Sequence, residues 1–467
     1  MAKPGVRERT SHRCSECGQT VAKWVGRCPE CQAWGSITEV GATRAVLTPG
    51  VVSSPARRIN EVDVEAARSR ATGVSELDRV LGGGLVPGAV VLLAGEPGIG
   101  KSTLLLEVAA RAAREGEPTL YVTGEESAAQ VRLRAGRTDA LDPHLWVAAE
   151  TDLGAVLSHL DAVRPGLLVI DSIQTIGSAE VEGSAGGVTQ IRAVTAALIA
   201  VAKERGIATV LVGHVTKDGG IAGPRLLEHL VDVVLHFEGD KHSTLRMVRA
   251  VKNRFGPADE VGCFALTDGG IVGLPDPSGL FLSSRPDAVP GTCVTVTVEG
   301  RRPLLAEVQA LVSAPLREGQ PKRAVSGLDP ARVGMVLAVV DSRGSVRLGA
   351  ADVYTATVGG VRLTEPATDL AVLLAVASAH CDKALPTDVI ALGEVGLSGD
   401  VRPVGDVHRR LSEALRLGFR RALVPPGSGP GPEGMTVVEV GDVMRALLAF
   451  HDLAAVPRPR RPPGRPR

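Results

Sequence analysis

The sequence predicts an α/β protein with a P-loop nucleotide-binding domain, a small N-terminal metal-binding module and a second α/β domain. Three observations support this fold class. Residues 95–102 read Gly-Glu-Pro-Gly-Ile-Gly-Lys-Ser and directly follow the apolar run of residues 89–94. Further apolar runs, each of the length of a buried strand, are separated by segments long enough for helices. Two C-x-x-C pairs lie near the start of the chain.

Length and composition limit the remaining possibilities. With 467 residues, of which 44% are hydrophobic, the chain is long enough for two large domains and small additions. The formal net charge is zero, so any binding of nucleic acid would depend on local basic patches. Residues 1–10 are polar and charged, and no apolar run has the length of a membrane span. We therefore expect a cytoplasmic protein.

Residues 1–40 are predicted to form a zinc module. Cys14, Cys17, Cys28 and Cys31 form two C-x-x-C pairs separated by ten residues, a spacing that lets four thiolates converge on one Zn²⁺. The alternative, a redox-active C-x-x-C, requires a thioredoxin-like βαβ context that this segment lacks. So short a segment has no core of its own, so metal binding would supply its folding free energy. We interpret Trp24 and Trp34 as its core, with stacking on a base or partner as the alternative. The nearby basic residues Lys23, Arg27 and Arg13 are expected to be exposed.

A linker is expected over residues 41–59, which are rich in Gly, Thr, Ser and Pro, and the nucleotide-binding core over residues 60–272. In its P-loop, backbone N–H groups would surround the phosphates, Lys101 would contact the β- and γ-phosphates, and the Ser102 hydroxyl would bind Mg²⁺. A glycine-rich turn alone would not need Lys and Ser at these positions. The predicted ATP-binding residues are Gly95, Glu96, Pro97, Gly98, Ile99, Gly100, Lys101, Ser102 and Thr103.

Polar residues at the ends of three further predicted strands are candidates for catalysis. Glu125 follows residues 119–123 and could polarise the attacking water, or could simply be a carboxylate favoured at a helix N-terminus. Asp171 directly follows the apolar residues 167–170, which is the pattern of a Walker-B Asp beside Mg²⁺. His214 directly follows residues 208–213, where it could sense the γ-phosphate or be structural.

Two glycine-rich stretches are candidate DNA-binding loops. They cover residues 177–187 and 217–225, and the second carries Lys217 and Arg225. Flexible backbone with cationic side chains at the ligand end of a sheet suits contact with DNA, although ordinary surface loops have a similar composition.

The motifs taken together resemble those of the bacterial RadA (Sms) family. In order they are the zinc knuckles, T-G-x-x-E-L-D-x-V-L-G-G-G at residues 72–84, the P-loop, Y-V-T-G-E-E-S at residues 121–127, V-I-D-S at residues 169–172, and K-N-R-F-G at residues 252–256. The last stretch distinguishes this family from other RecA-type ATPases. The resemblance covers nearly the whole chain.

The resemblance implies a RecA-type ATPase core and a function in DNA repair. Members of the family are expected to act in homologous recombination as hexameric rings related to replicative helicases, promoting branch migration on single-stranded and branched DNA together with the RecA recombinase. On this basis Glu125 takes the position of the catalytic glutamate. Lys252 and Arg254 would reach the ATP of a neighbouring subunit, as an arginine finger does, or contact DNA. A solvated turn after a strand is the other interpretation of these two cations.

For residues 273–452 the resemblance implies a domain similar to the Lon protease domain. Residues 363–370 and 393–404 carry this similarity. Proteolysis by that fold needs a Ser nucleophile and a Lys base, but Ala367 and His408 occupy those positions, so we expect a ring-building scaffold without protease activity. Some of its arginines could contact DNA: Arg402, Arg409, Arg410, Arg416 and Arg420. The Pro/Arg-rich residues 453–467 are expected to be a disordered basic tail that could bind phosphates.

Three classes of function therefore compete. The first is a DNA-dependent motor that uses ATP, Mg²⁺ and Zn²⁺. The second is a RecA-like regulatory or signalling ATPase, which would not need zinc knuckles together with Lys-Asn-Arg-Phe-Gly. The third is a Lon-like protease, which the missing Ser and Lys oppose.

Overall fold

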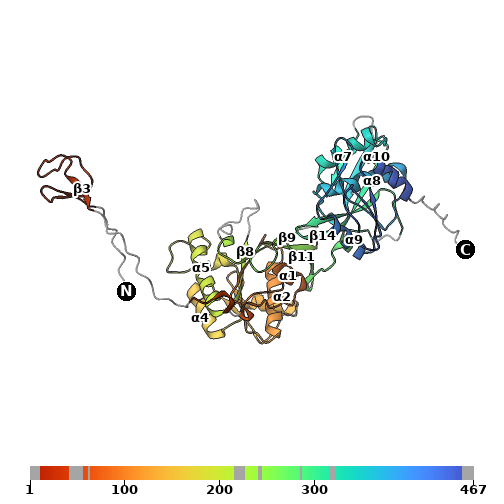
Figure 1. Cartoon of the computed structure of the whole chain (residues 1–467). Helices are drawn as coiled ribbons and strands as arrows, with labels where there is room; N and C mark the ends of the chain where they lie inside the picture. The colour runs from red at the N-terminus through yellow and green to blue at the C-terminus, as the bar shows by residue number, and fades with distance from the viewer. Residues whose placement is uncertain are drawn as a thin grey trace. The chain divides into compact units, whose positions relative to one another are not determined.

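The computed structural model describes residues 11–40, 56–61, 64–214, 227–239, 244–283, 287–315 and 321–454. The chain divides between Asp63 and Val64 into two compact units (Figure 1). The first contains the cysteine module and the second contains both large α/β domains. Among the described residues, no helix is both long enough and apolar enough to cross a membrane.

The cysteine module is a small antiparallel sheet in the order β2-β1-β3. Its strands are β1 (Ser11–Cys14), β2 (Thr20–Val21) and β3 (Ile37–Val40). The buried side chains are Cys14, Cys28, Ser36 and Ile37, against which Val21 packs. This interior has very few hydrocarbon side chains, as expected for a module that a metal ion would stabilise.

The ATPase domain is built on one sheet whose described strands have the order β12-β11-β10-β9-β4-β8-β7-β5-β6. The six from β9 to β6 are parallel, and β10, β11 and β12 extend the sheet in antiparallel fashion. The strands are β4 (Val90–Gly95), β5 (Thr119–Thr123), β6 (Leu145–Ala149), β7 (Leu167–Asp171), β8 (Ala208–His214), β9 (Val233–Gly239), β10 (Leu245–Asn253), β11 (Val261–Thr267) and β12 (Gly270–Gly273).

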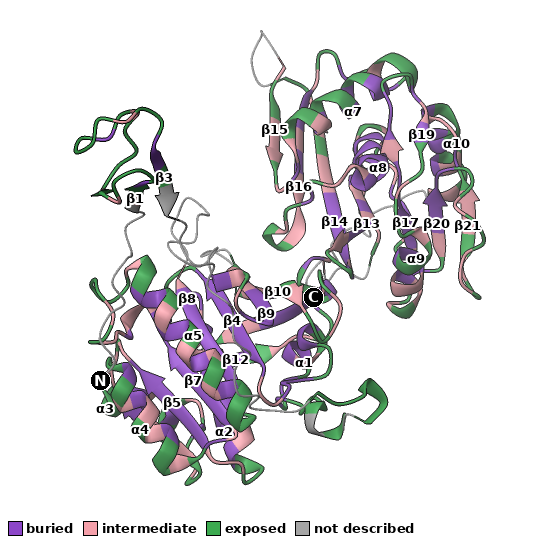
Figure 2. Cartoon of the chain, turned by 60° about the vertical axis from the view of Figure 1, so that its left-hand side comes forward, coloured by how far each residue is buried: buried purple, intermediate pink, exposed green. Residues whose placement is uncertain are grey.

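Helices cover both faces of this sheet, which is why its central strands are apolar throughout (Figure 2). Val91 and Leu93 pack with α1, α2 and α3, whereas Val90 and Leu92 pack with α4 and α5. The helices are α1 (Ser75–Leu81), α2 (Lys101–Arg114), α3 (Ala128–Arg137), α4 (Leu153–Val163) and α5 (Val188–Arg205). Ser127 and Gln130 form a capping box that starts α3 directly after the Gly-Glu-Glu segment, so α3 fixes where that segment ends.

The second α/β domain contains a sheet of order β15-β16-β14-β13-β17-β20-β21 and a separate pair, β18-β19. The strands are β13 (Thr292–Glu299), β14 (Arg302–Ser313), β15 (Arg323–Ser326), β16 (Asp352–Thr357), β17 (Val389–Ala391), β18 (Glu394–Val395), β19 (Val401–Arg402), β20 (Arg421–Val424) and β21 (Thr436–Glu439). The helices are α7 (Pro330–Arg343), α8 (Asp369–Cys381), α9 (Val407–Arg416) and α10 (Val443–Leu453). Of these, α7, α8 and α10 share one apolar core, while α9 packs in another.

Short 3-10 turns connect several of these elements: η1 (Ile59–Glu61), η2 (Glu65–Ala67), η3 (Ile173–Thr175), η4 (Ser278–Leu280), η5 (Val358–Gly360) and η6 (Pro366–Thr368). The predicted α/β class is confirmed for both large domains.

The two large domains are joined by a buried ion pair. Arg302, the first residue of β14, donates from its guanidinium to Glu76 of α1 and to the backbone carbonyl of Pro275. Glu76 also accepts from the backbone N–H of Cys263 in β11, at 2.9 Å. Both charged side chains are almost fully buried, and Glu76 also lies 3.5 Å from Arg79. Losing Glu76 would therefore leave the Arg302 charge without its carboxylate inside the protein, whereas losing Arg302 would leave Glu76 with the more exposed Arg79.

Candidate functional site

The P-loop lies at the carboxyl end of β4 and leads directly into α2. Gly98 and Gly100 have φ values of +78° and +113°, which favour glycine, and a Cβ on Gly95 would lie 2.6 Å from the Phe237 carbonyl oxygen of the adjacent strand β9. Lys101 Nζ donates to the backbone carbonyls of Gly95 and Glu96, both at 2.8 Å. The loop therefore holds its lysine folded back over the space that phosphates would fill.

Lys101 is buried beside carboxylates but forms no ion pair within the described residues. Burial lowers the pKa of its ammonium group to about 8, and the charges of Asp171, Glu125 and Glu96 only partly offset this effect. A buried cation whose hydrogen-bond partners are carbonyl dipoles is stabilised by a bound anion. The arrangement thus favours the binding of a phosphate group.

Asp171, at the end of β7, is held by a tyrosine. Tyr121 Oη, from the neighbouring strand β5, donates to Asp171 Oδ2 at 2.6 Å. Burial and the charge of Asp171 raise the pKa of Tyr121 well above its usual value, so Tyr121 stays a hydrogen-bond donor. Ser102 also interacts with the Tyr121 hydroxyl. The hydroxyl and carboxylate expected to bind Mg²⁺ therefore meet at one phenol, which fits a shared metal ion whose charge would stabilise the phosphates.

Glu125 is the carboxylate that faces the centre of this site. Its Oε1 accepts from Ser172 Oγ at 2.7 Å and lies 2.9 Å from His214 Nε2, so the ends of β5, β7 and β8 converge on one oxygen. Burial alone would raise the pKa of Glu125, but the hydrogen bonds from Ser172 and His214, together with the charge of Lys101, lower it. Glu125 is thus ionised at neutral pH, as a group that activates water must be.

The structure separates Glu125 from the adjacent Glu126. Glu126 forms an ion pair with Arg134 in the second turn of α3, so its charge is already neutralised. In the part of the chain that the structure describes, Glu125 forms no ion pair with Lys or Arg and contacts only the imidazole of His214 in this way. Sequence inspection did not select Tyr121 or Ser172 for the site. The sequence does contain a signal for each residue. Tyr121 is the aromatic residue of the buried strand β5, and Ser172 directly follows the Walker-B aspartate.

Lys252 and Arg254 lie at the opposite end of the same strands. Arg254 donates to Asp232 Oδ1 at 3.0 Å, and the other oxygen of Asp232 accepts at 3.1 Å from the backbone N–H of Val90, the first residue of β4. Lys252 donates to the carbonyls of Glu228 and Val231, at 2.7 and 2.8 Å. Because β4 has six residues at about 3.3 Å each, this end is separated from the P-loop by roughly 17 Å. Neither cation therefore reaches the ATP of its own chain.

The rest of the Lys-Asn-Arg-Phe-Gly motif packs on the glycine turn that follows α1. Asn253 Nδ2 donates to the carbonyls of Val80 and Leu81, at 3.3 and 3.1 Å. A Cβ on Gly82 would lie 2.9 Å from the Cα of Gly256, so the two segments require glycine on both sides. Two motifs that are far apart in the sequence form one surface here, on which Phe255 is exposed.

The four N-terminal cysteines converge as predicted. Their sulfur atoms all lie within 4.8 Å of one another, and the Cys14–Cys31 and Cys17–Cys28 separations are both 3.6 Å. A tetrahedron of Zn–S bonds of about 2.3 Å has edges of about 3.8 Å, so the sulfur positions fit one Zn²⁺. A hydrogen bond with Ser36 and another with the backbone of Cys17 lower the pKa of the Cys14 thiol to about 6. Despite a hydrogen bond with the backbone of Ala33, burial and the neighbouring cysteine sulfurs raise the pKa of Cys31 to about 12, so Cys31 would need the metal ion to lose its proton.

One prediction about this module is wrong. Trp24 and Trp34 are not its core, since they are 63% and 77% exposed. The core is formed by the cysteines and Ile37 instead, because ligand geometry already brings the chain together without a large side chain.

The two residues expected in place of a protease dyad lie in different elements of the second domain. Ala367 is buried in η6 and His408 lies in the first turn of α9. A buried ion pair lies between these segments: Arg410 Nη1 donates to Glu365 Oε2 at 2.9 Å and to the Val296 carbonyl at 2.7 Å. Glu365 also accepts from Thr297 Oγ1 at 3.2 Å. The expectation that Arg410 could contact DNA is therefore wrong, because this side chain is 2% exposed and its charge is paired internally.

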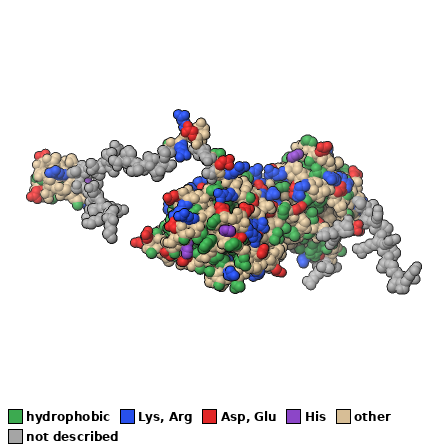
Figure 3. Space-filling view, turned by 90° about the horizontal axis from the view of Figure 1, so that it is seen from below, with side chains coloured by type: hydrophobic (Ala, Val, Ile, Leu, Met, Phe, Trp, Pro, Cys, Tyr) green, Lys and Arg blue, Asp and Glu red, His purple; other side chains and the backbone are tan. Residues whose placement is uncertain are grey.

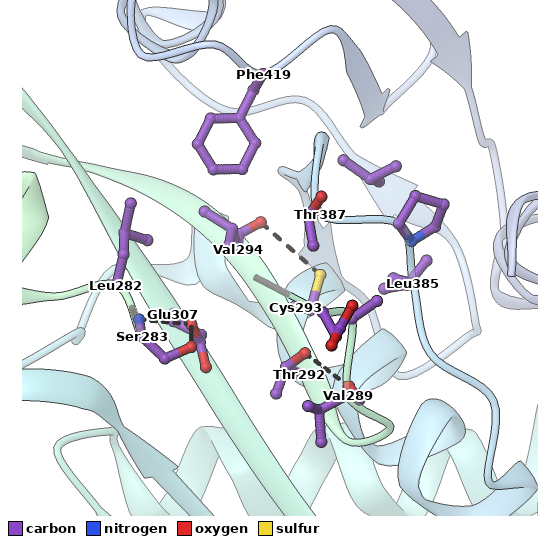
Figure 4. Close-up of a pocket in the computed structure, with 14 residues that line it drawn as sticks. Leu282, Ser283, Val289, Thr292, Cys293, Val294, Glu307, Leu385, Thr387 and Phe419 are labelled. Atoms are coloured by element: carbon purple, nitrogen blue, oxygen red, sulfur yellow. Dashed lines mark hydrogen bonds between the residues drawn. The ribbon is translucent and has the colours of Figure 1, made fainter. Parts of the chain in front are cut away.

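A cavity of about 160 Å³ lies beside β13 of the same domain (Figure 4). Its one thiol, Cys293, has a pKa raised by burial, so it remains protonated. One of its two carboxylates, Glu307, accepts hydrogen bonds from the backbone and hydroxyl of Ser283, at 2.9 and 2.5 Å, and from Gln309 at 2.8 Å. The other is the exposed Asp287, in the segment that precedes β13. The cavity thus offers no activated thiol, and Glu307 is held by hydrogen bonds of the fold. Among the other candidate residues, Lys217 and Arg225 lie outside the described residues.

Comparison with known proteins follows the same division of the chain. Residues 55–220 match a family described as an AAA domain, and residues 12–39 match a rubredoxin metal binding domain. A KaiC-like protein of Pyrococcus horikoshii matches 45% of this chain and 100% of its own, with 25% identity and a TM-score of 0.38.

Relatives named DNA repair protein RadA match nearly the whole chain. The protein of Mycolicibacterium smegmatis is 56% identical over 96% of this chain and 98% of its own length. That of Mycobacterium tuberculosis is 54% identical over 96% of this chain and 94% of its own. That of Streptococcus pyogenes is 44% identical over 95% and 100%, respectively. This chain, with its P-loop ATPase domain and four-cysteine zinc site, belongs to the family of the bacterial DNA repair protein RadA.

Proposed function

We propose that this protein is a DNA-dependent ATPase that acts in homologous recombination and DNA repair in the bacterial cytoplasm. It moves along single-stranded DNA as a hexameric ring and drives branch migration of recombination intermediates together with RecA. The name of its relatives supports the role in repair. The carboxylates, hydroxyls and lysine gathered at the P-loop support the hydrolysis of ATP.

In the proposed hydrolysis each residue has a distinct task. Lys101 would exchange its carbonyl partners for the phosphates of ATP, and Ser102 with Asp171 would hold a Mg²⁺ ion, which would supply positive charge to the phosphates. Glu125 orients and polarises the attacking water while Ser172 and His214 fix its carboxylate in one position. His214 lies at the end of β8 and contacts Glu125, so a change in β8 would alter the catalytic carboxylate directly.

The observation that carries the proposal is the position of Lys-Asn-Arg-Phe-Gly. Its cations lie at the end of the sheet remote from their own P-loop, so they contribute to hydrolysis only in the site of another subunit, or they bind DNA. Arg254 is the better placed of the two, because its side chain is 53% exposed, whereas both hydrogen bonds of Lys252 hold the turn at residues 228–231. We therefore assign the intersubunit or DNA contact to Arg254 and a positioning role to Lys252.

DNA stimulation of ATP hydrolysis tests this function against the alternatives. We expect single-stranded oligonucleotides to raise the ATPase rate of the full chain, with Lys101→Ala as the inactive control. An unchanged rate and no binding of DNA would instead favour a RecA-like regulatory ATPase. Cleavage of casein would indicate a protease, but the geometry around Ala367 and Glu365 gives no nucleophile for it.

A further inference from the structure

The cysteine module presents two indole rings to solvent instead of burying them. Trp24 and Trp34 are 63% and 77% exposed, and Val25 beside them is 38% exposed. Folding of the module does not account for these side chains, since its buried residues are Cys14, Cys28, Ser36 and Ile37. Exposed tryptophan of this extent in a small module indicates a binding surface.

The backbone brings the two rings to one place. Residues 26–27 and 34–35 pair through the Arg27–Trp34 bridge and through a hydrogen bond from Gly35 N to Gly26 O at 2.9 Å. A Cβ on Gly26 would lie 3.8 Å from the Trp24 ring and 3.9 Å from the Trp34 ring. The six-membered rings of both indoles thus border Gly26, which has no side chain, and the rest of each indole remains exposed to solvent.

A cation is already fixed on this surface. The Arg27 guanidinium lies 5.8 Å from the centroid of the Trp34 ring, and it donates to the side chain and backbone oxygens of Gln32 at 2.6 and 2.9 Å. Lys23 is exposed and precedes Trp24 in the sequence. Glu16 and Glu30, within the two C-x-x-C segments, are also exposed, so the module carries both basic and acidic side chains on its surface (Figure 3). Aromatic faces next to positive charge are the combination that binds single-stranded nucleic acid, with rings stacking on bases and cations on phosphates.

We propose that Trp24 and Trp34, with Lys23 and Arg27, form a base-stacking site for single-stranded DNA on the cysteine module. This inference rests on the proposed function, because it adds a second contact to the strand on which the ATPase domain moves. A protein partner would also bury tryptophan and arginine, but it would have no requirement for bases. That difference decides how the site is tested.

The protein reports on this site through its own fluorescence. It contains three tryptophans, so Trp146→Phe in the ATPase domain leaves Trp24 and Trp34 as the emitters in the full chain. We expect a mixed-sequence single-stranded oligonucleotide to quench this emission. An abasic oligonucleotide of equal length, which keeps the phosphates, should bind without quenching. Quenching by both, or by neither while the oligonucleotide is bound, overturns the proposal.

Substitutions provide the matched comparison. Trp24→Ala and Trp34→Ala should each weaken single-stranded DNA binding by about tenfold, the effect expected of one stacked base, whereas Trp24→Phe and Trp34→Phe should keep most of the affinity. Trp146→Ala, which removes a 53% exposed tryptophan from the ATPase domain, should leave the affinity unchanged. Zinc content, measured on every variant, identifies loss of the module fold. Equal DNA affinity of the zinc-loaded Ala variants and wild type would refute the site.

Failure of this inference is distinguishable from failure of the proposed function. If the site is wrong but the function is right, DNA still stimulates the ATPase and binds equally to the Ala variants. If the chain binds no single-stranded DNA at all, the proposed function fails with it. If DNA binding is unaffected but a purified RecA protein is captured less well by the Ala variants, the surface is a protein-docking site and the stacking proposal is refuted.

Discussion

The P-loop of the ATPase domain and the η6–α9 region of the second domain both bury charge, but in different ways. Lys101 is buried with carbonyl oxygens as its partners, so its charge is solvated but not neutralised. Arg410 is buried with Glu365, and Arg332 is paired with the buried Asp369. A buried charge without a counterion is available to a charged ligand, whereas one with a counterion is committed to the fold. The comparison explains why one region is suited to ATP and the other to a structural role.

The largest effect on ATP turnover is expected at Lys101, the buried charge without a counterion. Lys101→Ala should reduce ATP turnover by about a thousandfold or more, because the cation that stabilises charge on the phosphates is lost. A steady-state phosphate-release assay measures this, with zinc content and circular dichroism as controls for folding. Turnover close to that of wild type would contradict the assignment of the P-loop.

The pair Glu125 and Glu126 gives the next test, since the two residues are adjacent and only one faces the site. Glu125→Gln should lower the turnover number by about 10²- to 10⁴-fold with ATP binding retained. Glu126→Gln is the matched control and should stay within tenfold of wild type, because Glu126 pairs with Arg134. The reverse order of the two variants would transfer the catalytic role to Glu126.

Mixed assemblies test whether Arg254 acts on a neighbour's ATP. Arg254→Ala and Lys101→Ala proteins should each be nearly inactive, but in a randomly mixed ring about a quarter of the junctions pair an intact Lys101 with an intact Arg254. ATPase rate against mixing ratio, with subunit exchange verified, should therefore show partial recovery. Normal basal turnover of the Arg254 variant without complementation would leave the DNA contact, whose affinity and salt dependence should then fall.

Arginines that are paired with carboxylates in the second domain should affect stability and not catalysis. Arg410→Met leaves Glu365 without its cation. Because Glu365 is 31% exposed, the cost should be about 1.5–3 kcal/mol, below that of breaking a fully buried pair. Arg416→Met removes exposed pairs with Glu413 and Asp276 and should cost about 1 kcal/mol or less. Urea unfolding followed by circular dichroism compares the two variants. Equal stabilities would show that the Arg410–Glu365 pair does not hold the domain together.

The smallest effect concerns pH. Since burial lowers the pKa of Lys101 to about 8, the free protein loses this charge as the pH rises through 8. Above that pH, binding of ATP must be coupled to the uptake of a proton by Lys101. ATP affinity should therefore be constant below about pH 7 and decline by up to tenfold per pH unit above pH 8. Lys101→Arg, which stays charged, should show no such decline in an equilibrium binding assay between pH 7 and 9.5.

Sequence reasoning was most successful where a local pattern has only one physical interpretation. The P-loop, the apolar strands and the paired cysteines are such patterns, because chain geometry within a few residues forms each of them. It was least successful with side chains whose partners come from elsewhere. Trp24 and Trp34 are apolar enough for a core, but cysteine ligands took that place. In the sequence Arg410 cannot be told from the surface arginines near it, because its partner Glu365 lies far away along the chain.

By itself the sequence determined that the chain has a P-loop ATPase domain and a four-cysteine zinc site. It also predicted a second domain with Ala367 and His408 in place of a Ser-Lys dyad. Only the tertiary structure decided which of two adjacent glutamates faces the site, that Tyr121 and Ser172 support its carboxylates, and that Lys-Asn-Arg-Phe-Gly lies remote from its own P-loop. The physical reason is that these properties depend on the order and direction of strands in the sheet. The sheet brings together β4, β5, β7, β8 and β10, which are separated by long stretches of chain. Their arrangement cannot be predicted from a local sequence pattern.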